Sequence, residues 1–161
     1  MSASDPAIYR ERLWPSAQVW LGVAVVLVMA DVAVAAALGL VWGLAFTVAS
    51  TLTAGYWLVS SSLVVAVTVT ELRAGRAHLQ LALVNDLEWL DVDSLRAAMG
   101  PQADGRTYLA TRGWVSSAIR FTVADEADPT PDWIVSTRHP ATLIDVIATV
   151  QGDVAAEGTA G

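Results

Sequence analysis

The chain contains no cysteine, and all nine of its basic residues other than histidine are arginine. Without cysteine the protein can form no disulfide, no thiolate zinc site and no cysteine nucleophile. Its two histidines, His78 and His139, are too far apart in sequence to form a closely spaced ligand pair for zinc or non-haem iron. The sequence therefore predicts no metal site and no cofactor.

The sequence also lacks the short motifs that identify common enzymes. It has no P-loop, no G-x-G-x-x-G and no G-x-S-x-G. A Ser-His-Asp arrangement stays open, because its members need not be neighbours in sequence, but the serines at 60–62 read as a linker beside the membrane. No catalytic residue can be named, and we expect a protein that is not an enzyme.

Positive charge is scarce as well. The chain has a net charge of −7, and residues 60–161 contain seven arginines against thirteen acidic residues. Nucleic acids and anionic lipid surfaces both require basic protein surface. The acidic balance therefore argues against a nucleic-acid partner and against broad docking on anionic lipid.

One long apolar run dominates the N-terminal third. Residues 13–59 are nearly all apolar and contain one charge, Asp31, although the mean hydropathy of the whole chain is only +0.51. About 20 apolar residues cross a bilayer, so the run predicts a transmembrane hairpin with spans at 16–37 and 40–60. Aromatic residues favour the two interfaces of a membrane, and several lie near the predicted span ends: Trp14, Trp20, Trp42, Tyr56 and Trp57.

Basic residues predict the orientation of this hairpin. Arg10 and Arg12 precede the first span, Arg73 and Arg76 follow the second, and the turn at 38–40 has none. By the positive-inside rule both termini are cytoplasmic in a multi-pass protein of the cell membrane. A cleaved signal peptide is the alternative, with small-residue sites at 33–37, but the apolar run continues past them without a polar mature start.

Two features of the predicted spans have both a functional and a structural interpretation. Asp31 could be a proton-relay or partner-binding carboxylate, or it could reach the outer interface or bond to Ser or Thr of the second span. Small residues four apart form a stripe on the second span, which could pack against the first span or against another copy. The stripe consists of Gly43, Thr47, Thr51 and Gly55.

The remaining sequence predicts an α+β domain. Alternating apolar residues indicate strands at 63–70, 77–81, 84–90, 107–112, 118–124 and 133–136, with a turn at 71–75 and a short helix at 91–99. Pro140 suits the first turn of a C-terminal helix with Leu143, Ile147 and Val150 on one face. We expect a small antiparallel barrel or sandwich with that helix. The predicted segments are a cytoplasmic N-terminus at 1–15, the hairpin at 16–60, the domain at 61–150 and a disordered tail at 151–161.

Five short motifs carry a family resemblance: YRERLW at 9–14, ELRAG at 71–75, RGW at 112–114, DPTPDW at 128–133 and STRHP at 136–140. Together they resemble an actinobacterial family of two-helix membrane proteins that is known only as a domain of unknown function, and the match covers residues 9–150. The soluble part is similar to bacterial pleckstrin-homology-like domains. The resemblance implies a fold and a membrane location, but no activity.

Two surface features could bind a ligand. Arg73 and Arg76 flank a turn, and Arg112 and Trp114 mark another; if both turns lie at one end, they form a basic and aromatic anion site. Otherwise the arginines pair with nearby carboxylates and the tryptophan packs in the core. The acidic loop 125–132 could bind calcium, but prolines interrupt its spacing and a solvated loop is the simpler interpretation.

Three functions follow from these features. The first is a membrane-anchored cytoplasmic binding or scaffold module. The second is an accessory subunit that works through the hairpin within a larger membrane or cell-envelope complex. The third, an enzyme acting on lipid or an envelope precursor, is disfavoured because no acid, base or nucleophile set stands out. The expected partners are the lipid bilayer and a protein partner or second copy of the chain.

Overall fold

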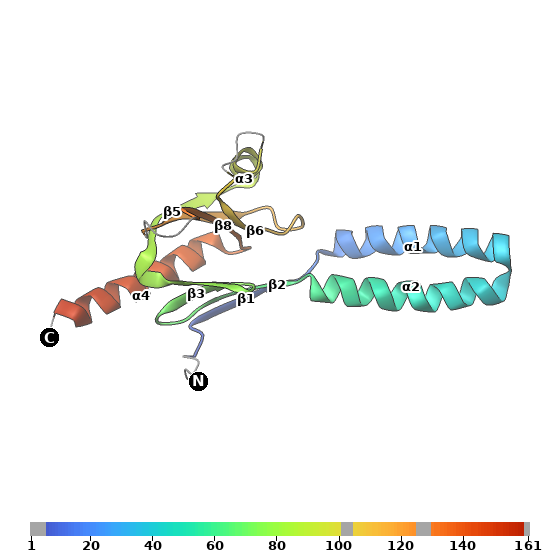
Figure 1. Ribbon diagram of the computed structural model, residues 1–161, viewed down its shortest axis with the longest axis horizontal. Coiled ribbons are helices and arrows are strands. Elements are labelled where there is room, and N and C mark those ends of the chain that lie inside the picture. The colour runs from blue at the N-terminus through green and yellow to red at the C-terminus, as the bar shows by residue number, and fades with distance from the viewer. Residues whose placement is uncertain (1–5, 101–104, 125–129, 160–161) are drawn as a thin grey trace. The chain divides into compact units, whose positions relative to one another are not determined.

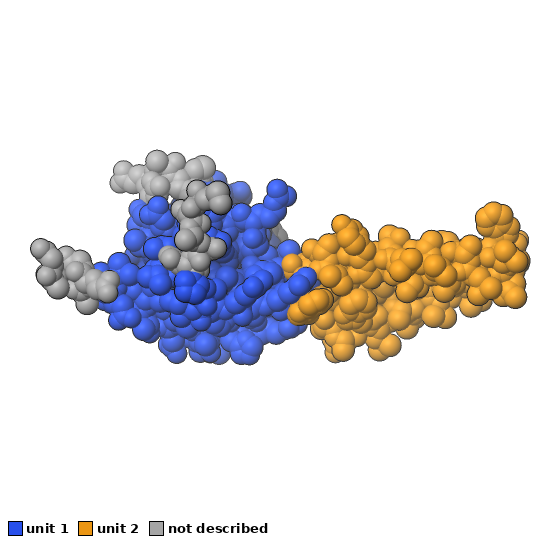
Figure 2. Space-filling view, turned by 90° about the horizontal axis from the view of Figure 1, so that it is seen from below, with its two compact units in different colours: residues 1–13, 63–161 blue, residues 14–62 orange. Residues whose placement is uncertain are grey.

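The computed structural model describes residues 6–100, 105–124 and 130–159, and the chain divides into two compact units (Figure 2). Residues 14–62 form one unit, which we call the helical unit. Residues 1–13 and 63–161 form the other, which we call the β domain. The helical unit is therefore an insertion in the β domain, and each is described separately.

The helical unit consists of two antiparallel helices, α1 (Ala17–Leu38) and α2 (Leu40–Ser60) (Figure 1). Ser16 caps α1, because its hydroxyl oxygen accepts a hydrogen bond from the backbone N–H of Val19 at 3.4 Å. Gly39 separates the helices with a φ of 92°, a left-handed conformation that a side chain would disfavour. The turn predicted at 38–40 is thus present.

Of the described helices, α1 alone is long and apolar enough to cross a membrane by length and composition. None of its residues is buried. The second predicted span coincides with α2, but that helix does not reach the same criterion. Its apolar residues alternate with glycine, serine, threonine and aromatic residues, which lower its hydropathy although it contains no charge.

The β domain begins with a four-stranded antiparallel sheet, sheet A. Its strands follow in the order β1 (Tyr9–Leu13), β2 (Leu63–Val67), β3 (Glu71–Ala74) and β4 (Ala77–Gln80). β1 and β2 pair over five residues, from Tyr9 opposite Val67 to Leu13 opposite Leu63. The two adjacent strands β1 and β2 of sheet A therefore come from the chain before and the chain after the inserted helical unit.

The second sheet, sheet B, has the order β5-β7-β8-β6. It contains β5 (Val84–Leu90), β6 (Tyr108–Ala110), β7 (Ala118–Val123) and β8 (Asp132–Ser136), and a 3₁₀ turn, η1 (Leu81–Leu83), connects it to sheet A. A short helix, α3 (Val92–Ala98), is capped by Asp91 and packs on the side of sheet B that faces away from the main core, over Leu90, Ala118 and Ile134.

The main core lies between the two sheets and the last helix, α4 (Pro140–Thr159) (Figure 1). Leu143 and Ile147 are fully buried there with Phe121 and Val65. Gln151 fixes the helix further along, because its side-chain amide donates to the backbone oxygens of Leu81 and Val84 at 2.7 and 2.8 Å. The predicted C-terminal helix is confirmed, together with its apolar stripe.

Several sequence predictions need correction. Residues 71–74 form a strand rather than a turn, since the chain turns at Val69–Thr70 and at Gly75–Arg76 instead. β6 and β8 are parallel, and the described strands form two sheets rather than a closed barrel. α4 continues to Thr159, so residues 151–159 are helical and not a disordered tail. The predicted domain boundary at residue 61 leaves out β1.

Replacing residues 14–62 by an Asn-Gly turn should give a soluble, folded β domain, because β1 and β2 already form an antiparallel pair that a short turn can close. A chain beginning at Ser61 should be much less stable, since it loses the edge strand and the buried side chain of Leu13. Circular dichroism during thermal unfolding compares the two. Equal unfolding midpoints would show that β1 contributes nothing to the domain.

Candidate functional site

The predicted pair Arg73 and Arg76 lies on sheet A. Both side chains are exposed, Arg73 on β3 and Arg76 in the turn that follows it. The guanidinium of Arg73 donates to the carboxylate of Glu71 through Nε and Nη2 at 3.1 and 2.9 Å. For Arg73 this is the local ion pair that the structural interpretation of the two arginines predicted, and at an exposed site it stabilises the fold only slightly.

The other predicted pair, Arg112 and Trp114, lies on the connection between β6 and β7. Trp114 is half-buried against the core, and its indole N–H donates to the backbone oxygen of Leu13 at 3.3 Å. The guanidinium of Arg112 donates to the backbone oxygen of Thr111 at 2.8 Å. Trp114 therefore helps to fix the end of β1, and the two predicted pairs belong to different elements.

The most unusual polar residue of the β domain is Glu11. Tyr9, Glu11 and Leu13 alternate on β1 with Arg10 and Arg12, and the register places them on the same side of sheet A as the buried Val65 and Val67. The side chain of Glu11 is only 10% exposed. A carboxylate on the core side of a sheet is costly unless hydrogen bonds compensate for the loss of water.

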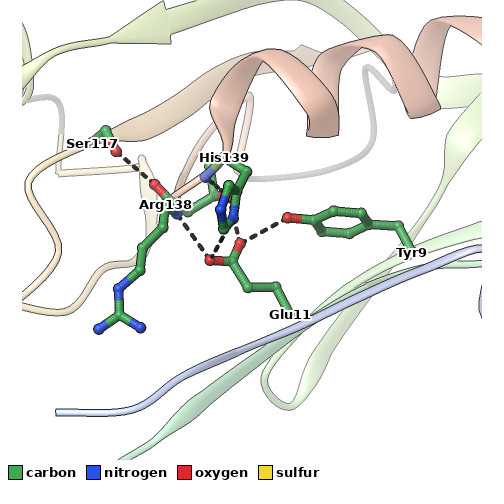
Figure 3. Close-up of polar contacts among 6 residues, drawn as sticks. Tyr9, Glu11, Ser117, Arg138 and His139 are labelled. Carbon is green, nitrogen blue, oxygen red and sulfur yellow. Dashed lines mark hydrogen bonds and ion pairs between the residues drawn. The ribbon is translucent and has the colours of Figure 1, made fainter.

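Glu11 receives those hydrogen bonds from β1 and from the connection between β8 and α4 (Figure 3). Its Oε2 accepts from the hydroxyls of Thr137 at 2.6 Å and Tyr9 at 2.9 Å, and its Oε1 accepts from the backbone N–H of Arg138 at 3.0 Å. His139 Nδ1 lies 3.6 Å from Oε1. We call these residues, with Ser117, the Glu11 cluster.

The cluster changes the pKa of two of its members. Burial alone would raise the pKa of Glu11, but the hydrogen bonds from Thr137, Arg138 and Tyr9, with the nearby His139, together lower it below its usual value. Burial and the Glu11 carboxylate raise the pKa of Tyr9 to about 12, against a smaller lowering by Thr137. At neutral pH the cluster thus holds an ionised carboxylate beside a neutral phenol.

The contacts of the cluster hold two parts of the fold together rather than forming a catalytic arrangement. Thr137 is fully buried, and its hydroxyl also accepts from the backbone N–H of His139 at 3.1 Å. Ser117 donates its hydroxyl hydrogen to the backbone oxygen of Thr137 at 2.7 Å, so it is not directed at the His139 imidazole as a nucleophile would be. The cluster joins an edge of sheet A to the start of α4.

Sequence reasoning missed this cluster. It assigned residues 9–14 to a family motif and to a segment before the first span, without recognising a strand. One signal was available: Tyr9, Glu11 and Leu13 alternate with Arg10 and Arg12, which is the period of a strand with one buried face. The partner strand is not recognisable locally, because the 49 residues of the apolar insertion lie between it and β1.

Within the helical unit, the structure gives Asp31 a polar neighbour. The hydroxyl of Ser50 on α2 lies 3.5 Å from its Oδ1, and the same hydroxyl approaches the backbone oxygen of Thr47 at 3.2 Å. A serine of the second helix beside Asp31 is the contact that the structural interpretation of this residue predicted. It agrees with a role inside the helix pair.

The stripe of small residues divides into two halves. A Cβ at Gly43 would lie 2.6 Å from the Cβ of Ala35, so Gly43 allows α1 and α2 to approach closely. Thr47 donates its hydroxyl to the backbone oxygen of Gly43. A Cβ at Gly55 would meet nothing within 4 Å, and Thr51 is exposed. Within the stripe, Gly43 is the position at which α1 approaches α2 closely.

Among the described residues, no group of three or more histidine, cysteine or acidic side chains could hold a metal ion. His78 is exposed on β4, and His139 belongs to the Glu11 cluster. Of the acidic loop considered for calcium, Asp125, Glu126 and Asp128 lie outside the described residues. Asp132 begins β8 and forms an ion pair with Arg120 at 3.3 Å.

The chain belongs to a protein family, since residues 8–147 match the family described as "Protein of unknown function (DUF3093)". The match begins one residue before β1 and ends in α4, so it covers both the helical unit and the β domain. No curated protein and no solved structure matches the chain.

Glu11→Gln should lower stability near neutral pH by about 1–3 kcal/mol, because charge-assisted hydrogen bonds are lost inside the fold. The lowered pKa means that the stabilisation by Glu11 is complete above its usual pKa and is lost as the pH falls through the folded-state value. The variant should therefore lose less stability than the original chain on acidification. Denaturant unfolding at several pH values measures both effects.

Glu88→Gln is the matched control, because Glu88 is exposed on β5. It should change stability little at any of these pH values. A Glu11→Gln curve parallel to that of the original chain would mean that the Glu11 carboxylate does not titrate as the cluster requires.

Gly43→Leu should destabilise the helical unit by about 1–3 kcal/mol, since the new side chain must displace the backbone and Cβ of Ala35. Gly55→Leu should be tolerated within one chain, because nothing lies within 4 Å of the added Cβ. Thermal unfolding in detergent distinguishes them. Equal losses in the two variants would contradict the close approach at Gly43.

Proposed function

We propose that this member of the DUF3093 family is a membrane-anchored binding or scaffold protein, in which the helical unit crosses the bilayer twice and holds the β domain at the cytoplasmic surface. The observation that carries the proposal is the pairing of β1 with β2 on either side of the insertion. The hydropathy of α1 supports membrane anchoring, because this helix is apolar enough to span a membrane and has no buried residue.

The strand pairing makes the number of crossings even. If α1 crosses a bilayer, Gly39 lies on the far side, yet Leu63 must return to pair with Leu13. The returning segment is α2, whose 21 residues extend about 30 Å at about 1.5 Å per residue, enough for a hydrocarbon core of about 30 Å. No charged residue occurs between Asp31 and Glu71. The helical unit thus crosses twice or not at all.

The same pairing argues against a cleaved signal peptide. Cleavage at the small-residue sites at 33–37 would separate β1 from the rest of the β domain. The domain would then lose the buried side chain of Leu13 and the carboxylate of Glu11 that bonds to Thr137. An uncleaved anchor preserves both contacts.

Charge supports the cytoplasmic location of the β domain. Arg10 and Arg12 lie immediately before α1, and no basic residue occurs between Arg12 and Arg73. Basic residues beside a span favour the cytoplasmic side.

Binding rather than catalysis is the proposed activity, because the hydrogen bonds of the Glu11 cluster are directed within the fold.

An accessory role in a larger membrane complex is the second candidate. It is favoured by the second half of the small-residue stripe, where Thr51 is exposed and a Cβ added at Gly55 would meet nothing within 4 Å. A helix of a partner, or of a second copy, could approach this part of α2 closely.

Reporter fusions test the proposed topology. An enzyme active only outside the cytoplasm should be inactive when fused after Thr159 and active when inserted at Gly39, whereas a reporter active only in the cytoplasm should give the opposite pattern. Extraction with alkaline carbonate should leave the chain in the membrane. Release by carbonate, or the same reporter activity at both positions, would contradict two crossings.

A further inference from the structure

Sheet A has one side outside the core, which we call the outer face. Figure 1 shows sheet B and α4 on the other side of sheet A. Alternation along the strands places Arg10, Arg12, Val64, Ala66, Glu71, Arg73, His78 and Gln80 on the outer face. None of these residues belongs to the main core.

The outer face is basic in an otherwise acidic protein. Its strands carry three arginines and one carboxylate, that of Glu71, and Arg76 extends the basic surface into the turn between β3 and β4. The side chain of Arg73 remains 50% exposed although it pairs with Glu71. The chain as a whole has a net charge of −7. The net charge of the sequence therefore conceals a local positive surface.

The cross-strand register places two of these arginines in one row across the sheet. Arg10 on β1 lies opposite Ala66 on β2, which lies opposite Arg73 on β3 and then His78 on β4. Because neighbouring strands are about 4.8 Å apart, Arg10 and Arg73 are separated by about 10 Å, with only the methyl group of Ala66 between them. Arginines spread in this way over separate strands suit several separate anionic groups better than one small ligand in a pocket.

The short connections between sheet A and the helical unit indicate that the nearest anionic surface would be a membrane. Three residues separate the end of β1 at Leu13 from the start of α1 at Ala17, and two separate the end of α2 at Ser60 from β2 at Leu63. If the helical unit crosses a bilayer, the sheet that carries the arginines is joined to it by very short segments at two points. Anionic headgroups attract arginines beside a membrane span.

We propose that the outer face of sheet A binds the phosphate groups of anionic phospholipids in the membrane that the helical unit crosses. This inference rests on the proposed membrane anchoring and adds the ligand of the β domain. Arg10, Arg73 and Arg76 contact lipid phosphates, and Arg12 adds positive charge next to the span. The expectation against broad docking on anionic lipid rested on net charge alone, which does not show that the register places arginines on one face.

The absence of cysteine makes a direct test possible with the full chain in lipid nanodiscs. Gln80→Cys places a fluorescent label on the outer face. Thr142→Cys places one at an exposed position of α4 as a reference. Nanodiscs contain phosphatidylcholine alone or mixed with phosphatidylglycerol. Quenching by acrylamide, which is uncharged, reports the exposure of each label without responding to the negative surface potential of anionic lipid.

Protection of the label at position 80 is expected only with phosphatidylglycerol, and added salt should remove it because salt screens the attraction. Arg10→Gln with Arg73→Gln should lower the ratio of docked to undocked domain about 30-fold. Arg10→Lys with Arg73→Lys retains the charge and should retain most of the protection. Arg96→Gln with Arg106→Gln is the control, since it removes the same charge from α3 and from the segment before β6.

Each other outcome contradicts the proposal. Equal quenching at position 80 in both lipids, or retained protection in the double glutamine variant, would show that the outer face does not bind anionic lipid. Equal changes at positions 80 and 142 would show an effect without a specific face. A chain that enters nanodiscs but shows no lipid dependence refutes only this inference, whereas failure to enter them refutes the membrane anchoring as well.

Discussion

The antiparallel pairing of β1 with β2 is the contact on which the architecture depends. These strands are adjacent in sheet A, from Tyr9 opposite Val67 to Leu13 opposite Leu63, although 49 residues separate them in sequence. Closing so long an insertion costs conformational entropy. A preformed pair of antiparallel helices reduces that cost, because it brings both ends of the insertion together. The helix pair and the strand pair therefore both favour a chain whose residues 13 and 63 are neighbours.

β1 also shows how one strand can serve two surfaces. On its inner side Glu11 accepts hydrogen bonds from Tyr9, Thr137 and Arg138, which fix the edge of sheet A to the start of α4. On its outer side Arg10 and Arg12 contribute to the basic face. A shift of the register by one residue would exchange these sides, placing arginines in the core and the carboxylate outside. The Glu11 hydrogen bonds thus also specify the register that displays the arginines.

The sequence predicted much of the local structure because local periodicity determines it. The ranges for α1, α2, α3, α4, β5 and β7 agree closely at their N-terminal ends. Long-range pairing was not predictable in this way. β1 is short and its partner lies beyond the insertion, and the parallel contact of β6 with β8 has no local signal. The Glu11 cluster was missed for the same reason, whereas the alignment of Arg10 with Arg73 becomes visible only when β1, β2 and β3 are placed in register.

Disulfide formation in the full chain tests the β1–β2 pairing most directly, because the chain has no cysteine of its own. Arg12 and Val64 are opposite each other, and paired positions in a sheet lie within the Cα distance that a disulfide requires. Arg12→Cys with Val64→Cys should therefore crosslink rapidly under mild oxidation. Arg12→Cys with His78→Cys, on the far edge strand, should remain reduced. An uncrosslinked first pair, or equal crosslinking of both pairs, would contradict the sheet that holds the two ends of the helical unit together.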